Sequence, residues 1–179
     1  MELPFGFHYQ RLLASGKLEA LRFAWEVRGN LSQLQAKVQE IEELISNPGE
    51  ALKGPLSPGA GPRIYRDGYL EGLKKAIKII STDDSEPSDK FPLQVKVLST
   101  LLCQILLAEG REAAFDFAWE IQGNLSDLQA RIWEIEQLVS NPPEFLRDLS
   151  LPSAGMHIYL EGYLTGLKDI IEIISSSQP

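Results

Sequence analysis

The chain contains two long copies of one sequence pattern. Residues 12–81 align without a gap on residues 106–175, an offset of 94, and 40 of the 70 aligned pairs are identical. The clearest stretch is FAWEVRGNLSQLQAKVQEIEELISNP, which begins at residue 23 and returns as FAWEIQGNLSDLQARIWEIEQLVSNP at residue 117. Identity of this extent over a fixed period indicates internal duplication of one structural unit.

The repeat sets the expected domain organisation. We expect residues 1–82 to form a first helical repeat and residues 92–179 a second, joined by a polar linker at 83–91. The segment STDDSEPSDK at 81–90 contains proline and no apolar anchor, which is typical of a connection between structural units. Because the repeats are so similar, we expect them to pack as one pseudo-symmetric domain.

Each repeat has the apolar periodicity of three helices. Helix A should end at LLASG or LLAEG, with Gly16 or Gly110 as its C-cap. Helix B is expected over 17–46 and 111–140, where Asn-Pro ends it. Helix C is expected over 63–81 and 157–175. The predicted fold class is therefore all-α: six helices arising from a tandem duplication of a three-helix unit, arranged as a pseudo-twofold helical bundle.

Both copies of helix B contain Gly-Asn in their middle, at Gly29-Asn30 and Gly123-Asn124. A heptad pattern of apolar residues runs through this point without losing phase, which favours one continuous helix. The alternative makes Asn30 an N-cap, with Gln33 as its capping-box partner; Asp127 takes that place in the second copy.

Small residues repeat along helices B and C. On helix B they are Gly29, Ser32 and Ala36, and this stripe predicts a core helix that a neighbour crosses closely. Helix C contains glycine pairs four residues apart in both copies, which predict the same kind of close crossing. The pairs are Gly68 with Gly72 and Gly162 with Gly166.

Charge and composition exclude several classes of function. The net charge is −8; residues 1–85 contain 11 basic and 11 acidic residues, and residues 86–179 contain 6 and 14. An acidic chain without a basic cluster is a poor match for phosphate backbones, so we do not expect nucleic-acid binding. No apolar stretch is long enough for a membrane helix, and no secretory signal is expected. The single cysteine, Cys103, cannot form an internal disulfide, which favours the cytoplasm.

Catalytic motifs are missing from the sequence, and we expect no cofactor. The chain has two histidines and one cysteine at unrelated positions, with no zinc-binding spacing, phosphate-binding loop or nucleophile elbow. Carboxylates of helices B and C would either form a solvated face or act as Mg²⁺ ligands in an all-helical nucleotide hydrolase. Its ligands would be Glu40, Glu43, Asp67 and Glu71.

Two further sets of residues are candidates for function. Polar and aromatic residues retained beside the core in both copies would line a ligand pocket or form a structural network. They are Trp25, Glu26, Asn30, Tyr65, Tyr69, Trp119, Glu120, Asn124, Tyr159 and Tyr163. Residues that reverse charge between copies would mark an interface or result from drift on a solvated face, and an added aromatic ring would cover a core edge or anchor an interface. They are Arg22, Lys75, Lys78, Asp116, Asp169, Glu172 and Trp133.

These observations favour a non-enzymatic helical interaction, scaffold or regulatory protein that works through protein–protein contacts, including self-association. Duplicated units with diverged charge allow one scaffold to present two different faces. Two alternatives stay open at this point. One is the metal-dependent nucleotide hydrolase, and the other is a small-ligand-binding protein with its pocket at the pseudo-twofold axis.

Overall fold

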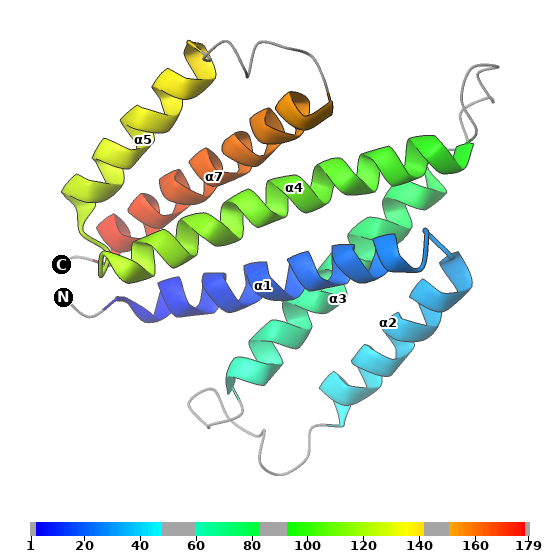
Figure 1. Ribbon diagram of the computed structural model, residues 1–179. Coiled ribbons are helices and arrows are strands. Elements are labelled where there is room, and N and C mark those ends of the chain that lie inside the picture. The colour runs from blue at the N-terminus through cyan, green and yellow to red at the C-terminus, as the bar shows by residue number, and fades with distance from the viewer. Residues whose placement is uncertain (1–2, 48–59, 83–92, 142–150, 178–179) are drawn as a thin grey trace. The chain divides into compact units, whose positions relative to one another are not determined.

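The computed structural model describes residues 3–47, 60–82, 93–141 and 151–177 (Figure 1). Within these ranges the chain forms six α-helices and no β-strand, so the all-α fold class is confirmed. The predicted linker at 83–91 lies outside the described residues. The helices are α1 (Phe5–Glu26), α2 (Leu31–Ser46), α3 (Ala60–Ser81), α4 (Leu93–Glu120), α5 (Leu125–Ser140) and α7 (Leu151–Ser176).

The chain divides into two compact units. One, which we call the N-unit, contains residues 12–105; the other, the C-unit, contains residues 1–11 and 106–179. Helices α1 and α4 therefore each contribute one part to each unit. In the N-unit α2 packs against α3, and in the C-unit α5 packs against α7.

Helix B is broken at Gly-Asn, so the prediction of one continuous helix is wrong in both copies. Helix α1 ends with a Schellman motif: the Gly29 N–H donates to the Ala24 carbonyl at 2.9 Å, and the Arg28 N–H donates to the Trp25 carbonyl at 2.9 Å. Arg28 and Gly29 both have positive φ, 52° and 69°. This turn brings the chain out of α1 within four residues, and helix α4 ends in the same way at Gln122 and Gly123.

The alternative interpretation of Asn30 as an N-cap is confirmed. Its side-chain oxygen accepts from the Gln33 N–H at 3.2 Å, and Asn124 accepts from the Ser126 and Asp127 N–H groups at 3.0 and 3.4 Å. Each cap satisfies a donor that the first turn of the new helix leaves unpaired. The Gly-Asn pair therefore closes one helix and opens the next.

The predicted end of helix A is also wrong. Gly16 and Gly110 lie inside α1 and α4, which continue for another ten residues to Glu26 and Glu120. A Cβ at Gly16 would meet the carbonyl oxygen of Tyr65 and lie 2.8 Å from the Tyr69 nitrogen. Gly16 is therefore required for a close helix crossing and not for a cap.

Glycines on helix C complete that crossing, as the sequence predicts. A Cβ at Gly68 would meet the Leu13 carbonyl, and one at Gly72 would lie 2.7 Å from the Ala20 Cβ. The C-unit repeats these contacts at the equivalent positions, between Gly162 and Leu107 and between Gly166 and Ala114. Helices α1 and α3 thus approach backbone to backbone in the N-unit, as α4 and α7 do in the C-unit.

Helix α2 is not the core helix that its small residues predict. Ser32 and Ala36 are exposed, while Leu34 and Ile41 are buried. The break at residues 27–30 leaves α2 with one buried face, which packs on α3. Helix C begins earlier than predicted, at Ala60 in α3 and at Leu151 in α7.

The same repeat positions are buried in both units. The pairs, each 94 residues apart, include Ala24 and Ala118, Leu34 and Leu128, Ile41 and Ile135, Tyr69 and Tyr163, Leu73 and Leu167, and Leu101 and Phe7. The last pair shows that each unit receives an equivalent segment from the long helix of the other repeat. The two cores are therefore built to one pattern.

Candidate functional site

Trp25 and Trp119 each lie next to last in their helix. The preceding residues, Ala24 and Ala118, are fully buried, and the turn of the helix directs the tryptophans away from the core. They are 37% and 47% exposed. Neither ring is therefore a core residue of the kind that a structural network would need.

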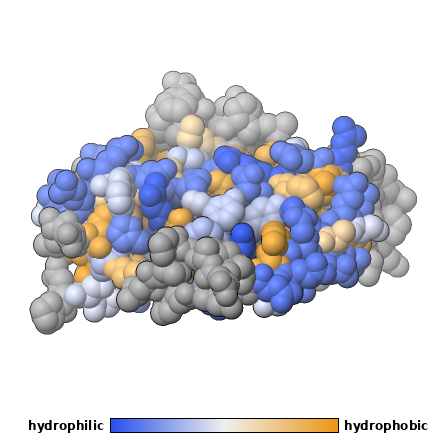
Figure 2. All heavy atoms as spheres, turned by 90° about the horizontal axis from the view of Figure 1, so that it is seen from below, coloured by the Kyte–Doolittle hydropathy of each residue, from blue (hydrophilic) through white to orange (hydrophobic). Residues whose placement is uncertain are grey.

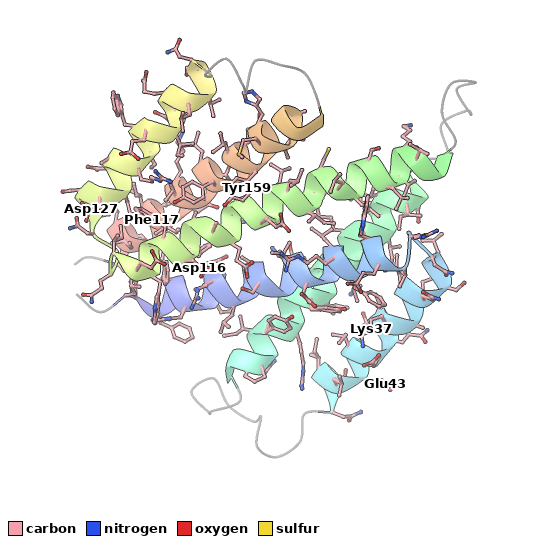
Figure 3. All side chains as sticks on the ribbon, in the orientation of Figure 1. Lys37, Glu43, Asp116, Phe117, Asp127 and Tyr159 are labelled. Atoms are coloured by element: carbon pink, nitrogen blue, oxygen red, sulfur yellow. The ribbon has the colours of Figure 1, made fainter. Side chains whose placement is uncertain are left out.

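In the C-unit, Trp119 belongs to an exposed aromatic cluster. The His8 ring meets the Trp119 ring edge-on, with centroids 5.2 Å apart. The Arg11 guanidinium lies 5.3 Å from the centroid of the Trp119 ring, a cation–π geometry. Arg11 also donates to the Asp116 carboxylate at 2.8 and 3.2 Å. Asp116 lies on α4, as labelled in Figure 3.

Helical spacing explains why these side chains meet. His8 and Arg11 are three residues apart on α1, and Asp116 and Trp119 are three apart on α4, so each pair shares one helix face. Phe5 precedes His8 by three residues and is 61% exposed. We call Phe5, His8, Arg11, Asp116 and Trp119 the aromatic cluster.

Buried neighbours fix the helices that carry the aromatic cluster. Phe7 and Phe115 are fully buried, and their ring centroids are 5.4 Å apart. The Phe7 ring also meets His8 at 85° with centroids 5.8 Å apart. The cluster therefore stands on a packed part of the C-unit core. On the face drawn in Figure 2, hydrophobic residues interrupt the hydrophilic surface in several places.

The N-unit has the same tryptophan in a different setting. The positions equivalent to Phe5, His8 and Arg11 are Ser99, Leu102 and Ile105, and Arg22 replaces Asp116. Leu102 is exposed and Ile105 is buried. The N-unit thus lacks both members of the Arg11–Asp116 ion pair: Ile105 takes the place of Arg11, and Arg22 takes the place of Asp116.

The other polar and aromatic candidates are distributed among separate structural roles. Asn30 and Asn124 are N-caps. Glu26 and Glu120 are the exposed last residues of α1 and α4. The tyrosines lie in pairs on helix C, with ring centroids 6.4 Å apart in both units. The pairs are Tyr65 with Tyr69 and Tyr159 with Tyr163.

Two of these tyrosines, Tyr69 and Tyr159, have raised pKa values. Burial, followed by nearby acidic groups of which Glu19 is the first, raises the pKa of Tyr69 to about 12. Burial, followed by the neighbouring Tyr163, raises the pKa of Tyr159. Arg131 stacks 5.5 Å from the Tyr163 ring centroid. Tyr69 and Tyr159 are therefore suited to packing and hydrogen bonding and not to proton transfer near neutral pH.

The residues that reverse charge between repeats are partly used inside the C-unit. Asp116 pairs with Arg11 at 2.8 Å, and Asp169 pairs with Arg111 at 2.9 Å. Lys78 and Glu172 are exposed on helix C. The reversals at Asp116 and Asp169 therefore have local partners, which weakens the argument that they mark an external interface.

One ion pair has moved by a helical turn between the units. In the N-unit Lys17 binds Glu71 at 2.8 Å. In the C-unit the equivalent of Lys17, Arg111, binds Asp169, and the equivalent of Glu71 is Thr165. Two other pairs are retained: Lys74–Glu42 with Lys168–Glu136, and Lys37–Glu40 with Arg131–Glu134.

Trp133 is the most exposed tryptophan, at 64%. It lies on α5, on the side opposite the buried Leu128 and Ile135. Its equivalent in the N-unit is Gln39, which is also exposed. Trp133 is thus a second exposed tryptophan in the C-unit, on the face of α5 opposite the core.

The four carboxylates of the metal hypothesis do not form a site. Glu40 binds Lys37 with both oxygens at 2.8 Å, and Glu71 binds Lys17. Across the described residues, no three His, Cys, Asp or Glu side chains gather as metal ligands would. Glu43 and Asp67 are among those residues, so the four carboxylates are not grouped together in the structure.

Comparison with models of known protein families, with characterised proteins and with solved structures finds no match for this chain. Among the described helices, none has the length and apolar character needed to span a membrane.

Sequence reasoning missed Phe5, His8 and Arg11. Arg11 and Asp116 are 105 residues apart, and no local pattern indicates that the start of α1 belongs to the C-unit. A signal was nevertheless present, because Phe5, His8 and Arg11 recur every three residues beside the buried Phe7. The repeat also indicates that Arg11 pairs with Asp116, because both members of the pair differ at the equivalent positions, Ile105 and Arg22.

Proposed function

We propose that this chain is a non-enzymatic, cytoplasmic interaction protein that binds another protein, or a second copy of itself, through the aromatic cluster. The observation that carries the proposal is an exposed Trp119 in contact with both His8 and Arg11, with the exposed Phe5 three residues before His8 on α1. Tryptophan and arginine are the residue types most enriched among interface residues that dominate binding energy.

Preorganisation supports this proposal. Arg11 is held by the Asp116 carboxylate and by the Trp119 ring, so a partner would not have to order this long side chain on binding. Ordering such a side chain costs about 0.5–1.5 kcal/mol at an interface. The buried Phe7 fixes the backbone beneath the cluster. The aromatic cluster is thus ready to bind without rearrangement.

The proposal includes the origin of the scaffold. We infer that the two units derive from a tandem duplication, supported by the 40 identical pairs and by equivalent buried positions. The pseudo-twofold relation of the repeats and the domain limits at 82 and 92 stay predictions from the sequence. Divergence of the surface around Trp25 and Trp119 would then give one unit a binding role that the other lacks.

Site-specific photo-crosslinking in extracts of the native cell tests the proposal. A photoreactive aromatic amino acid, which keeps a ring at the substituted position, replaces Trp119, Trp25 or Trp133 of the full chain. We expect discrete crosslinked products of defined mass from position 119 and not from position 25. A second copy of the chain as partner would give a product of twice its mass.

Two results would contradict the proposal. One is the absence of a discrete product from position 119; the other is an identical set of products from positions 25 and 119. Products from position 133 alone would transfer the binding role to the exposed face of α5, where Trp133 lies.

A further inference from the structure

Building on the proposed function, we propose that the aromatic cluster binds a cationic segment of another protein, one that carries apolar side chains beside Lys or Arg. The inference depends on the charge of the unit that holds the cluster. The C-unit contains 5 basic and 13 acidic residues, whereas the N-unit contains 12 of each. The whole net charge of −8 thus belongs to the C-unit.

The described basic residues of the C-unit are already paired. Arg11 binds Asp116, Arg111 binds Asp169, Arg131 binds Glu134 and Lys168 binds Glu136, each at 2.8 or 2.9 Å. These pairs neutralise four carboxylates and leave the rest of the acidic excess to act on the surroundings. A binding partner therefore meets a negative field, which attracts cations and repels anions.

That field reaches the aromatic cluster. Asp116 and Glu120 flank Trp119 within one turn of α4, and Glu120 is exposed. Asp116 is paired with Arg11, so the pair is locally neutral, while Glu120 adds negative charge beside the exposed ring. Charges within about 8–10 Å act on one another at physiological salt. A lysine or arginine next to an apolar residue in contact with Trp119 would lie within that range.

Charge also discriminates among other occupants. A second copy binding cluster to cluster would bring two units of charge −8 together, which is repulsive. Binding of the cluster to the neutral N-unit of a second copy would gain little from charge. Anionic surfaces such as nucleic acid or acidic lipid would be repelled. The cationic protein segment is the occupant that both the aromatic rings and the charge favour.

The test measures binding of a defined probe to the full chain. The probe is a fluorescein-labelled amphipathic peptide of leucine and lysine, about 18 residues or five helical turns long. A matched peptide has glutamate in place of lysine. Fluorescence anisotropy is recorded at about 50 and 300 mM salt, a range over which screening of exposed charges increases strongly.

We expect the lysine peptide to bind and to weaken at the higher salt, and the glutamate peptide not to bind. Trp119→Ala should weaken binding by about tenfold or more, the loss typical of a dominant interface residue. Trp25→Ala is the matched control, because it removes the same exposed ring from the equivalent position of the N-unit, and it should change binding less than about threefold. Trp119→Phe, which keeps a ring, should have an intermediate effect, and circular dichroism checks folding of each variant.

Each contrary outcome overturns a distinct claim. Equal binding of the two peptides overturns the charge inference. Equal losses from Trp25→Ala and Trp119→Ala, or none from either, overturn the assignment of the peptide to the aromatic cluster. If the lysine peptide does not bind although position 119 crosslinks to a partner, the proposed function stands and the cationic partner is wrong. If the lysine peptide does not bind and sedimentation of the free chain shows self-association that depends on Trp119, the partner is a second copy of the chain and not a cationic segment.

Discussion

The two tryptophans at the ends of α1 and α4 have the same backbone beneath them and different neighbours around them. Trp25 and Trp119 both precede a Schellman turn and follow a buried alanine. Around Trp119 lie His8 and Arg11, while the equivalent positions in the N-unit are Leu102 and Ile105. Core, turn and helix crossing are the same in both units, and the surface differs between them in groups of residues that contact one another.

The ion pair between Lys17 or Arg111 and helix C also differs between the units through a group of contacting residues. Lys17 and Arg111 each bind a carboxylate of helix C, but the carboxylate is Glu71 in one unit and Asp169, one turn later, in the other. The change from Lys75 to Asp169 therefore has a local partner change beside it. A charge reversal between repeats is informative about binding only after its partner inside the unit has been found.

The helix crossing is where the two units should behave most alike. Gly162→Ala places a Cβ against the Leu107 backbone, and Gly68→Ala places one against Leu13. Because backbone atoms cannot move aside as a side-chain end can, we expect each substitution to lower the free energy of unfolding by about 3 kcal/mol. Urea unfolding followed by circular dichroism measures the loss.

Gly155→Ala is the control for that experiment. It lies on the same helix as Gly162, and its Cβ would be 3.5 Å from the Leu106 Cδ1, an ordinary contact. The gain in helix propensity, up to about 1 kcal/mol, should leave this variant as stable as the natural chain or more so. Gly162→Ala with unchanged stability would show that α4 and α7 do not cross so closely.

Substitution of the two turn glycines should destabilise the two units by different amounts. Gly29 and Gly123 share φ of 69°, where alanine is strained by about 1–2 kcal/mol. A Cβ at Gly29 would lie 3.4 Å from Ile80, whereas one at Gly123 would lie 2.5 Å from Leu3 and 3.0 Å from Ile174. We expect Gly29→Ala to lower the free energy of unfolding by about 1 kcal/mol and Gly123→Ala by about 2 kcal/mol.

The same unfolding measurement compares these two variants. Equal losses would mean that Leu3 moves aside without cost, and that the N-terminal segment is not held against the turn of the C-unit. A larger loss for Gly29→Ala would contradict the difference in packing that the two turns show.

These turns also mark the limit of prediction from sequence. The Gly-Asn pair is compatible with two structures, because an unbroken heptad phase favours a continuous helix and Asn30 favours a cap. The heptad phase is the weaker indicator of the two. Only Leu34 and Ile41 of α2 are buried, so α2 does not need apolar residues along the whole heptad pattern. Gly16 misled for a related reason, since glycine at a cap and glycine at a close crossing look alike in a sequence.

Other features followed directly from local chemistry. The ends of α2 and α5 at Asn-Pro and the close crossing at Gly68 and Gly72 depend on steric rules that operate within a few residues or on one helix face. The aromatic cluster did not follow, because α1 begins in one unit and ends in the other. Contacts between segments 105 residues apart have no local signature.

The displaced ion pair predicts a rescue. Asp169→Lys places a lysine beside Arg111, and we expect it to lower the free energy of unfolding by about 1 kcal/mol, the upper range for an exposed pair. Adding Thr165→Glu recreates the N-unit arrangement and should restore stability to within about 0.5 kcal/mol of the natural chain. About 1 M salt should reduce the difference between the two variants.

The effect of Thr165→Glu on the natural chain tests whether the two ion pairs are alternatives. If Thr165→Glu improves the natural chain as much as it improves Asp169→Lys, the glutamate acts independently of Arg111, and the two pairs are not alternatives. The reciprocal variants Glu71→Thr and Lys75→Asp in the N-unit make the same comparison around Lys17.

The smallest expected effect is a gain. Arg28 and Gln122 hold φ of 52° and 53° at the position of a Schellman motif where glycine is usual. Glycine relieves the left-handed strain of about 1 kcal/mol or more but adds freedom to the unfolded chain, so the net gain should be about 0.5 kcal/mol. We expect Arg28→Gly and Gln122→Gly to stabilise by equal amounts in thermal unfolding, because their backbones match. Arg28→Ala is the control, because it keeps the backbone strain and removes the arginine side chain. If Arg28→Ala destabilises the protein and Arg28→Gly gives no gain, the Arg28 side chain makes a stabilising contact that offsets the strain in the N-unit alone.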